Sequence, residues 1–499
     1  MTARAEVRET VLSLVAGEPY DSGDWLEREN PVRPSEVVGR VSIVSSDGVD
    51  AAVVAADQAF VGWSALSVED RIDQVLRACD AVAAEDEQLA TLLSLEMGKV
   101  PAGTLGEIRF ANTFARYCAG IVADLIKPRR TVDASGRLEV VHEPFGVVAA
   151  VTPWNAPVIL SYLKVIPALL TGNTVVLKPS PLAPLAITRL LSTLGSNLPA
   201  GVLSVVNGDG PVGAALTGHP LVRKVAFTGG STVARHIMRA TAENLVPSVM
   251  ELGGNDAAVF LADAELSEAQ MELAILGSFL SSGQVCMAAK RLYVHSSRIE
   301  EFTDAYVAVA KDLLVTGDPL EPGVTIGPLI NRAAVARVEE LTAAAVGRGA
   351  TAHVLGTVQS ESVVAEGYFA LPTLLTGVRD DDRVVAEEQF GPVVPLLSFD
   401  DVDEVVERVN NDPLGLGSSV WSADVDRAFA IGRRLKTGYT FINSHNRYGM
   451  SMKAPFGGMK GSGFGREYGP DGVLEYVQAH SLFAPAATED AQGYPGQSS

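Results

Sequence analysis

Four apolar runs decide the fold class of this chain: GVVAAVTPWN (146–155), TVVLKPS (174–180), VLSVVNG (202–208) and KVAFTG (224–229). Helical patterns separate them, and valine-rich strands that alternate with helices are typical of a parallel sheet covered on both faces. Ligands of such sheets bind at the edge where the strands end. Polar residues follow the predicted strands at that edge, namely Asn155, Lys178, Asn207 and the pair Thr228-Gly229. The pattern therefore predicts a ligand site there.

The same alternation extends outward in both directions. Apolar residues recur at steps of three and four in the ranges 48–98, 105–126, 158–170, 184–194, 211–216 and 231–243, which predicts helices. From residue 1 to about residue 45, the sequence predicts an irregular N-terminal segment with short strands. A second α/β region begins near Asn255, with a strand in NDAAVFLADA, a helix over 265–280 and a strand in KRLYVHSS (290–297), and it continues to about Asn446.

Bulk composition excludes several classes of protein. The chain has 499 residues, 47% of them hydrophobic, and a net charge of -21, which disfavours binding to nucleic acid or to anionic membranes. No apolar run approaches the roughly 20 residues of a membrane helix. The three cysteines show no paired spacing, so we expect neither a disulfide framework nor a metal site. We therefore expect a cytoplasmic protein.

One cysteine stands in a context that suggests reactivity. Cys286 lies in SSGQVCMAAKR, after a turn and shortly before Lys290 and Arg291. Nearby positive charge lowers the pKa of a thiol, so we expect Cys286 to favour the thiolate. The alternative is a small core residue. Cys79 and Cys118 fall within amphipathic helical patterns, and for these two the core interpretation is preferred.

Other polar residues each have two interpretations. Glu251 opens ELGGND and is either a solvated strand end or a general base beside a glycine turn. Asn155 is either a turn residue or an amide donor aimed at developing negative charge. Lys178 is either an exposed lysine or a ligand of ribose or phosphate. FTGGSTVA (227–234) is a glycine-rich turn that opens a helix, which suits a pyrophosphate, although it is not a GxGxxG motif.

Taken together, these segments resemble the aldehyde dehydrogenase superfamily from about residue 30 to residue 482. Seven motifs occur in the order typical of that family: TPWN (152–155), LKPS (177–180), FTGGSTVA (227–234), ELGG (251–254), GQVC (283–286), EEQFGP (387–392) and APFGGMKGSGFGRE (454–467). The resemblance implies oxidation of an aldehyde to a carboxylic acid with NAD(P)+. It implies that Cys286 is the nucleophile, that Asn155 and the backbone N–H of Cys286 form the oxyanion hole, and that Glu251 activates water.

The resemblance also implies a cofactor site. Lys178 would hold the adenine ribose, Glu388 the nicotinamide ribose, and Phe390 would pack near the ring. The remaining cofactor-binding residues implied by the resemblance are Thr152, Pro153, Trp154, Ser180, Gly229, Ser231 and Leu252. Ala234 and Gly230 depart from the commoner glycine and serine, which should adjust cofactor contacts. Pro181 replaces a glutamate found in many NAD-preferring members, so the cofactor is NAD or NADP, with NAD favoured as the commoner one.

For the substrate, the resemblance implies a roomy aliphatic pocket. Residues expected to line it are Ala156, Leu160, Leu163, Leu280, Met287 and Phe456. Several of these stand where aromatic residues are frequent, which suggests a bulky or long-chain aldehyde. Arg447 lies in the segment that corresponds to the loop at the entrance. Arg447 would either bind a carboxylate on the substrate or be a solvated arginine in a loop.

The implied architecture is an α/β fold with a Rossmann-like cofactor-binding domain, an α/β catalytic domain and a small β oligomerisation element. The cofactor-binding domain would span 1–124 and 144–254, and the catalytic domain 255–461. The bridging element would combine 125–143 with 465–486, and 487–499 would be disordered. RRTVDASGRLEVVHEP (129–144) predicts a hairpin whose exposed edge suggests a homodimer or homotetramer.

Two alternatives stay open at this point. A CoA-acylating relative would pass the acyl group to CoA rather than to water, and the presence of Glu251 favours water. A catalytically inactive relative would act as a binding or structural protein. Loss of Cys286, Asn155 or Glu251 would have indicated the second alternative, and all three are present.

Overall fold

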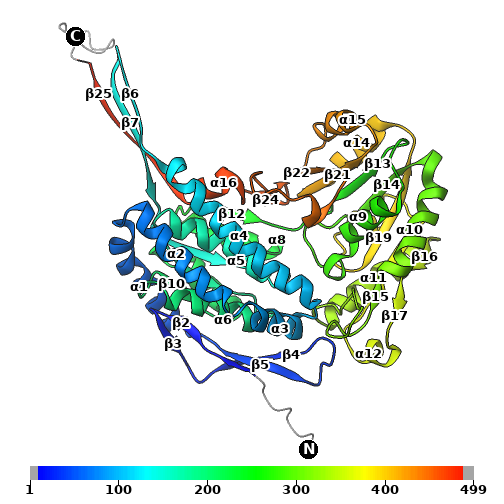
Figure 1. The fold of residues 1–499 in the computed structure, drawn as a ribbon, viewed down its shortest axis with the longest axis horizontal. Helices are drawn as coiled ribbons and strands as arrows, with labels where there is room; N and C mark the ends of the chain where they lie inside the picture. The colour runs from blue at the N-terminus through cyan, green and yellow to red at the C-terminus, as the bar shows by residue number, and fades with distance from the viewer. Residues whose placement is uncertain (1–8, 487–499) are drawn as a thin grey trace, which may run out of the picture.

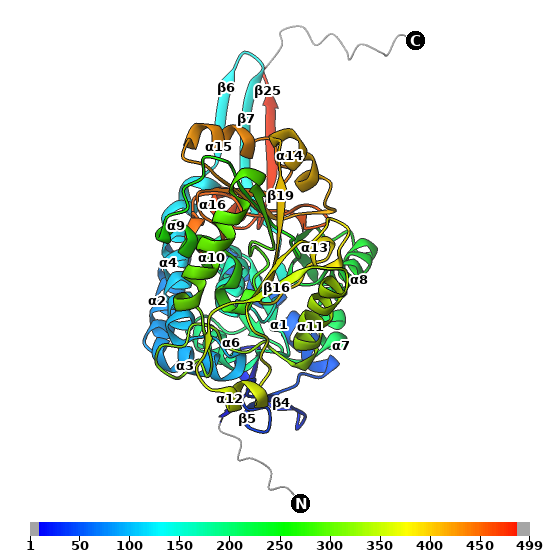
Figure 2. The same ribbon diagram turned by 90° about the vertical axis from the view of Figure 1, so that its right-hand side faces the viewer.

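The structure is a computed structural model that describes residues 9–486. Two α/β bodies lie side by side, and a narrow β arm projects from the first of them (Figure 1). The view turned by 90° shows the same arm standing clear of both bodies (Figure 2). The fold is therefore the predicted α/β class, with two sheet-based bodies and a small β element.

The first sheet contains the four apolar runs that decide the fold. Its order is β24-β12-β11-β8-β9-β10-β2-β3. The strands are β2 (Ser13–Val15), β3 (Glu18–Tyr20), β8 (Val147–Val151), β9 (Thr174–Lys178), β10 (Leu203–Val205), β11 (Val222–Thr228), β12 (Ser248–Glu251) and β24 (Gly463–Phe464). The strands β8 to β12 are parallel, and Val151 pairs with Lys178 while Thr228 pairs with Glu251. The predicted polar residues therefore meet at one edge of the sheet.

Helices cover both faces of this sheet (Figure 1). They are α1 (Ser46–Ser64), α2 (Val68–Ala83), α3 (Asp86–Met97), α4 (Pro101–Ile126), α5 (Pro157–Leu170), α6 (Leu185–Ser196), α7 (Gly210–Thr217) and α8 (Ser231–Glu243). The helical pattern predicted over 48–98 divides into three helices because Ser45 and Ser67 cap the first two and Gly98, at φ 74°, ends the third. Cys79 and Cys118 lie in the core, and burial raises the pKa of the Cys79 thiol to about 12.

The second body is built on a sheet of order β16-β18-β19-β14-β13-β21-β22. Its strands are β13 (Ala257–Phe260), β14 (Arg291–His295), β16 (Thr351–Val354), β18 (Thr373–Thr376), β19 (Val393–Phe399), β21 (Gly417–Trp421) and β22 (Tyr439–Ile442). Its helices are α9 (Glu268–Phe279), α10 (Ile299–Leu313), α11 (Arg332–Gly347), α12 (Glu361–Glu366), α13 (Arg383–Ala386), α14 (Val402–Asn410) and α15 (Val425–Gly432). Cys286 lies between α9 and β14, in the loop that crosses toward the first body.

The arm is an antiparallel sheet of β6 (Arg129–Asp133), β7 (Gly136–Pro144) and β25 (Val477–Pro485), in the order β25-β7-β6. The hairpin predicted over 129–144 is confirmed, and the third strand follows α16 (Gly469–Leu474). Every residue of β6 is exposed, as is β25 beyond Val477. The arm thus carries two exposed edges. The expected disordered tail, 487–499, lies outside the described residues.

Short elements complete the chain. The strands β1 (Glu9–Val11), β4 (Trp25–Glu29) and β5 (Val37–Ser42) form a small sheet in the predicted N-terminal segment. Two further strand pairs are β15 (Val315–Thr316) with β17 (Thr357–Val358), and β20 (Leu414–Gly415) with β23 (Met459–Lys460). The 3₁₀ segments are η1 (Leu280–Gly283), η2 (Ser296–Arg298) and η3 (Asn446–Gly449). Within residues 9–486, no helix has the length and apolar character needed to cross a membrane.

Candidate active site

A cavity of about 430 Å³ lies where the first sheet ends and the second body begins. We call it the edge cavity. It is lined by Pro153, Trp154, Asn155, Thr228, Gly229, Gly230, Ser231, Thr232, Val233, Glu251, Leu252, Gly253, Cys286, Glu388, Phe390, Leu414 and Gly461. The three residues predicted to carry the chemistry, Cys286, Asn155 and Glu251, therefore line one cavity, although they come from segments far apart in the sequence.

The loop that presents Cys286 has an unusual backbone. Ser281, Ser282 and Gly283 all have positive φ angles, of 53°, 59° and 72°. A Cβ atom at Gly283 would lie 2.3 Å from the carbonyl oxygen of Gly391, so only glycine fits there. The side-chain amide of Asn155 donates to the carbonyl oxygen of Gln284 at 3.0 Å and ties the loop to the first body. Among residues 9–486, the backbone N–H of Cys286 has no acceptor, so it can serve an incoming oxygen.

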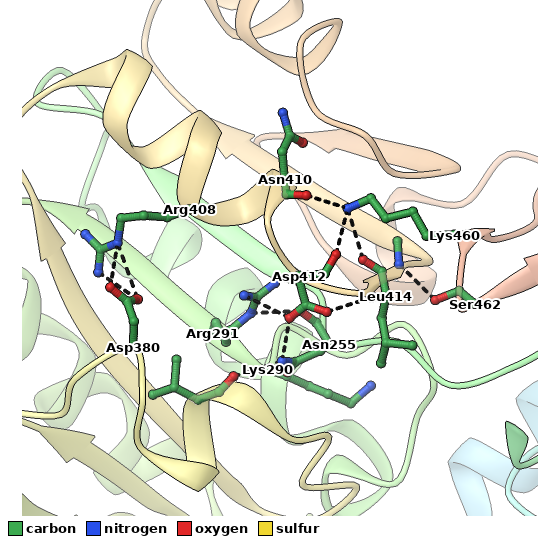
Figure 3. A network of polar contacts seen from close by, with 12 residues as sticks. Asn255, Lys290, Arg291, Asp380, Arg408, Asn410, Asp412, Leu414, Lys460 and Ser462 are labelled. Carbon is green, nitrogen blue, oxygen red and sulfur yellow. Dashed lines mark hydrogen bonds and ion pairs between the residues drawn. The ribbon is translucent and has the colours of Figure 1, made fainter. Parts of the chain in front are cut away.

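The expectation that nearby cations favour the thiolate is wrong. The Lys290 ammonium donates to the carbonyl oxygen of Cys286 at 2.5 Å and pairs with Glu388 at 3.0 Å. Arg291 pairs instead with Asp412 at 3.1 Å (Figure 3). Burial raises the pKa of the Cys286 thiol to about 12, because the effect of Lys290 is smaller than desolvation. The thiol is therefore protonated until a base removes its proton.

Glu251 is the last residue of β12, and both of its carboxylate oxygens are buried without a side-chain partner. Burial, followed by the nearby Glu467 carboxylate, raises the pKa of Glu251 well above its usual range. The ammonium of Lys164 donates to Glu467 Oε1 at 2.5 Å and to Thr228 Oγ1 at 2.6 Å. Lys164 and Glu467 thus form a buried charged pair beside Glu251.

This pair was not predicted from the sequence, although the composition of α5 indicates it. Lys164 is the only charged residue in α5, PVILSYLKVIPALL, and it is fully buried. A buried lysine needs a partner, and a lysine inside such an apolar helix therefore predicts a carboxylate from elsewhere. Glu467 closes the last of the seven motifs.

The glycine turn after Glu251 approaches Glu388 closely. The backbone N–H of Gly254 donates to Glu388 Oε1 at 3.2 Å, and a Cβ atom at Gly253 would lie 2.2 Å from Glu388 Oε2. Phe390 has φ 49°, and its ring meets that of Trp154 edge to face at 5.7 Å between centroids. Glu388, Phe390 and Trp154 line the edge cavity together, and their contacts to a cofactor stay predictions.

A polar network that includes Asn255, Asp412 and Lys460 begins directly after this turn (Figure 3). Ser462 donates to the carbonyl oxygen of Gly253 at 2.7 Å, and Asn255 donates to Asp412 at 2.9 Å. Lys460 donates to the carbonyl oxygens of Asn410, Asp412 and Leu414 at 3.0, 3.0 and 3.3 Å. These hydrogen bonds hold the glycine turn through Gly253 at one end and through Asn255 at the other.

The edge cavity has features that fit a dinucleotide. Helix α8 begins at Ser231 without a side-chain cap, so its first N–H groups are available to a phosphate. A Cβ atom at Gly230 would contact nothing within 4 Å, which leaves room above the helix end. Four further residues that were predicted to bind the cofactor also line the cavity: Pro153, Gly229, Ser231 and Leu252.

Three predicted cofactor residues lie at the same sheet edge but do not line the edge cavity: Thr152, Lys178 and Ser180. Lys178 is buried, and burial lowers its pKa to about 8 while Asp209 raises it. Asp209 directly precedes α7, and a Cβ atom at Gly213 in that helix would lie 3.4 Å from Lys178 Cδ. Asp209 was not among the residues predicted to bind the cofactor.

A second cavity of about 370 Å³, the apolar cavity, shares Asn155 with the first. It is lined by Gly98, Lys99, Val100, Gly103, Gly106, Glu107, Phe110, Asn155, Ala156, Ile159, Leu280, Ser281, Ser282, Gln284, Val285, Met287, Thr325, Gly327, Pro328, Asn446, Arg447, Tyr448, Met450 and Tyr468. It contains three of the six predicted pocket residues, Ala156, Leu280 and Met287.

The other three predicted pocket residues do not line this cavity. Leu163 and Phe456 are buried in the core, and Leu160 is half-buried against it. Ile159, the neighbour of Leu160 on α5, forms part of the wall instead. The α4 residues Gly103, Gly106 and Phe110 also line the cavity and were not predicted.

The chain was compared with known proteins. The model of the aldehyde dehydrogenase family matches residues 19–482. Glutarate-semialdehyde dehydrogenase of Pseudomonas putida is 37% identical, over 94% of this chain and 98% of that protein. The NADP(+) succinate-semialdehyde dehydrogenase of Escherichia coli is 36% identical, over 93% of this chain and 96% of that protein. The crystal structure of betaine aldehyde dehydrogenase from Staphylococcus aureus with NAD+ is 30% identical, with a TM-score of 0.90 over 97% of this chain and 96% of that one.

Proposed function

This chain belongs to the aldehyde dehydrogenase family, and from that premise we propose that Cys286, Asn155 and Glu251 carry the chemistry of an NAD(P)-dependent aldehyde dehydrogenase. The reaction is the oxidation of an aldehyde to a carboxylic acid. The observation that carries the assignment of roles is the position of a thiol, an amide and a carboxylate around one cavity. No other cysteine competes for the role, because Cys79 and Cys118 are buried in the core.

In the proposed mechanism, Glu251 accepts the proton of Cys286, and the sulfur attacks the carbonyl carbon of the aldehyde. The Asn155 amide and the Cys286 backbone N–H donate to the oxyanion that forms. Loss of one such donor typically lowers the rate by about 100- to 1,000-fold. Glu388 and Phe390 would hold the nicotinamide end of NAD(P)+, which would supply the acceptor for the hydride of the substrate carbon. Once Glu251 has released this first proton to solvent, it takes a proton from the water that attacks the thioester and returns it to the departing Cys286 sulfur, which releases the acid and the thiol.

Water is the acyl acceptor in this proposal. A buried carboxylate without a hydrogen-bonding side chain stands beside the nucleophile, which is where a general base for water is needed. Transfer to CoA would not need such a base. The alternative of an inactive relative has no support among the residues of the edge cavity, since nucleophile, donor and base are all present.

For the cofactor, we favour NAD+ over NADP+. Lys178 holds the adenine ribose, and Asp209 places a negative charge beside Lys178, where a 2′-phosphate would be repelled. Ser180 adds a hydroxyl at the same sheet edge. Asp209 therefore takes over the role that the glutamate missing at Pro181 plays in many relatives.

The substrate proposal follows from the apolar cavity. Its walls carry small or aliphatic side chains such as Ala156, Leu280 and Met287, and two glycines of α4 leave extra room. A long or bulky aliphatic body fits such walls. The curated relatives at 36 to 37% identity include enzymes named for glutarate semialdehyde and succinate semialdehyde.

The remaining proposals concern organisation. We assign 1–124 and 144–254 to cofactor binding, 255–461 to catalysis, and 125–143 with 465–486 to the bridging element. Support comes from the first sheet, the second sheet and the arm, which follow this division, while β24, which lies between the catalytic and bridging segments, joins the first sheet. The exposed edges of the arm support a homodimer or homotetramer. We place the protein in the cytoplasm.

The test is a comparison of three variants with aldehyde and NAD+, following reduced nicotinamide. Cys286→Ala should abolish oxidation while calorimetric binding of NAD+ stays near wild type. Asn155→Ala should lose about 100- to 1,000-fold in kcat. Glu251→Gln should be slow to form the thioester, which mass spectrometry of the intact protein measures, and slow to hydrolyse any thioester that forms. Turnover by Cys286→Ala at the wild-type rate would remove Cys286 from the mechanism, and dependence on added CoA would reject water as the acceptor.

A further inference from the structure

Helix α5, which begins shortly after the proposed oxyanion donor, has no cap within its own segment. Its N-cap residue, Ala156, has no side-chain acceptor, and its first helical residue, Pro157, has no N–H to donate. Bonding within the helix starts with Leu160, whose N–H donates to the carbonyl oxygen of Ala156 at 3.1 Å. The N–H groups of Val158 and Ile159 therefore need an acceptor from another part of the chain.

A carboxylate from α4 supplies that acceptor. Glu107 Oε1 accepts the N–H of Val158 at 2.9 Å and that of Ile159 at 3.4 Å. The Glu107 side chain is 8% exposed, so water competes little for these hydrogen bonds. A negative charge at the start of a helix is also favoured by the helix dipole. Glu107 therefore caps α5 from a position 51 residues before Val158.

The other oxygen of Glu107 is held as well. The Lys99 ammonium donates to Glu107 Oε2 at 2.9 Å, and the Lys99 side chain is also mostly buried. Lys99 follows Gly98, where a Cβ atom would clash with Pro328, so the chain is tightly packed at this point. Each oxygen of the Glu107 carboxylate thus has a donor. The carboxylate is fixed against the start of α5, although Glu107 also lines the apolar cavity.

Asn155 lies close to the capped end of α5. Only Ala156 and Pro157 separate it from Val158, and the ring of Pro157 fixes one backbone angle of this connection. Asn155 is 6% exposed, and its side-chain amide donates to the carbonyl oxygen of Gln284 at 3.0 Å. Because the connection is short and its proline is rigid, a displacement of the helix end would also displace the Asn155 amide.

We propose that Glu107 is a positioning residue for the oxyanion hole, because its cap on α5 holds the Asn155 amide where the substrate oxygen becomes negatively charged. This inference rests on the proposed function, in which Asn155 is a donor to that oxygen. Such a donor stabilises the charge only when it is held in place before the reaction. Lys99 supports the same arrangement by holding Glu107. Glu107 itself transfers no proton.

The test is a double-variant cycle on the single-turnover rate of nicotinamide reduction at saturating aldehyde. Glu107→Ala should lower this rate by about tenfold to a hundredfold, because a small displacement of a catalytic group has an effect of this size. In an Asn155→Ala background, the same change should lower the rate by less than about twofold, since no amide is left to misplace. The rising limb of kcat/KM against pH should match that of wild type, because Glu251 controls it.

Glu107→Gln keeps the volume of the side chain and one acceptor oxygen, so it provides the same cycle if Glu107→Ala does not fold. It should lower the single-turnover rate by a smaller factor, about three- to tenfold, because a neutral oxygen binds an N–H less strongly than a carboxylate does. This loss should also disappear in the Asn155→Ala background.

Glu96→Gln is the matched control. The Glu96 carboxylate accepts the N–H groups of Leu185 and Ala186 at 2.9 Å, at the start of α6, and Glu96 lines neither cavity. Denaturant unfolding should show that both glutamine variants weaken a helix cap. Only Glu107→Gln should slow the single turnover.

Three results would overturn the inference. The first is a loss in the Asn155→Ala background as large as that in wild type, and the second is a shift of the rising pH limb, which would make Glu107 a titrating group of the reaction. The third is an effect confined to the KM for aldehyde, which would make Glu107 a substrate contact. A wild-type rate in Asn155→Ala alone would instead reject the role of Asn155 in the proposed function, and the inference would fall with it.

Discussion

Burial disfavours the charged forms of both Cys286 and Glu251, which determines how the reaction can begin. The pKa of the thiol is raised to about 12 and that of the carboxyl well above its usual range, in each case mainly by burial. A protonated carboxyl cannot accept the proton of the thiol. The reaction therefore requires Glu251 to ionise, and the neighbours that tune this step are Glu467, which raises its pKa, and Lys164, which lowers it.

This arrangement predicts opposite pH shifts for two variants. Since Glu251 must be ionised, kcat/KM should rise with pH through the raised pKa of that group. Glu467→Gln removes a negative charge and should move the rising limb to lower pH, whereas Lys164→Met removes a positive charge and should move it to higher pH. Both variants should also lose stability, by about 3–5 kcal/mol, because a buried charge loses its partner. The measurement is kcat/KM against pH, with denaturant unfolding for stability.

Lys224→Met is the control for that pair of variants, because it breaks another lysine–glutamate pair, with Glu475 at 2.9 Å, outside the edge cavity. Its rising limb should match that of wild type. Shifts of Glu467→Gln and Lys164→Met in the same direction would show that Glu251 is not the group that controls the profile.

Asp209 carries a separate prediction about the cofactor. Asp209→Asn removes the negative charge beside Lys178 and should improve use of NADP+ relative to NAD+ by on the order of tenfold, since one unfavourable charge contact near a protein surface is worth a kcal/mol or more. Calorimetric binding of 2′-phospho-ADP-ribose against ADP-ribose checks this without turnover. Asp47→Asn, an acidic residue in the first turn of α1, is the control. An unchanged ratio in Asp209→Asn would separate Asp209 from the ribose site.

Among the helices, α4 combines a structural and a functional role. Its residues Ile108, Ala111, Phe114 and Cys118 pack into the core of the first body. Gly103 and Gly106 on the same helix line the apolar cavity, and a Cβ atom at either would contact nothing within 4 Å. Glycine inside a helix costs about 0.5–1 kcal/mol relative to alanine. At these two glycines, helix α4 is therefore less stable than it would be with alanine, and the apolar cavity is wider.

A larger side chain at Gly106 should separate these two effects. Gly106→Leu should raise the free energy of unfolding by about 0.5–1 kcal/mol and lower kcat/KM for long-chain aldehydes, while short ones remain substrates. Gly120→Leu is the control, because a Cβ atom there also contacts nothing but Gly120 does not line the cavity. It should stabilise equally and leave activity unchanged. An unaltered chain-length profile in Gly106→Leu would argue against passage of the substrate beside α4.

The local sequence pattern predicted elements well and long-range contacts poorly. The helix predicted over 231–243 matches α8 at both ends, because a glycine turn and an amphipathic period define it. Together with the family resemblance, the motifs also predicted that Cys286, Asn155 and Glu251 belong to one site. It did not reveal that Glu467 reaches Lys164, or that β24 pairs with β12, since such contacts depend on the path of the whole chain.

Two predictions were wrong because of the position or the partners of individual side chains. Leu163 was expected in the substrate pocket, but it faces the core, and Ile159 lines the cavity from the same helix. The prediction of a thiolate at Cys286 relied on nearby lysine and arginine in the sequence. Those side chains are engaged by Glu388 and Asp412, which no local pattern indicates.

For the molecule as a whole, the arm is the feature that most needs a partner. It projects from the body (Figures 1 and 2), and its outer strand β25 exposes Leu482 and Phe483. Exposed apolar strands with free edges are prone to pairing with another chain. The arm is consistent with the proposed homo-oligomer, in which a second copy covers these side chains.

A charge on the arm should therefore weaken assembly. Phe483→Asp should shift the protein toward a smaller species in sedimentation velocity, because an unpaired carboxylate in an interface is unfavourable by several kcal/mol. Val61→Asp is the control, because Val61 is 72% exposed on α1, away from the arm. It should leave the sedimentation coefficient unchanged. A monomeric wild-type protein, or an unaffected Phe483→Asp variant, would remove the arm from assembly.

The shared position of Asn155 in the walls of both cavities has a kinetic consequence. In the proposed mechanism, the dinucleotide and the aldehyde occupy separate cavities, and Asn155 is the one lining residue that these two cavities share. A compound that fills the apolar cavity should then raise the apparent KM for aldehyde without competing against the dinucleotide. Steady-state inhibition patterns with a saturated long-chain acid would accordingly be competitive toward one ligand and non-competitive toward the other.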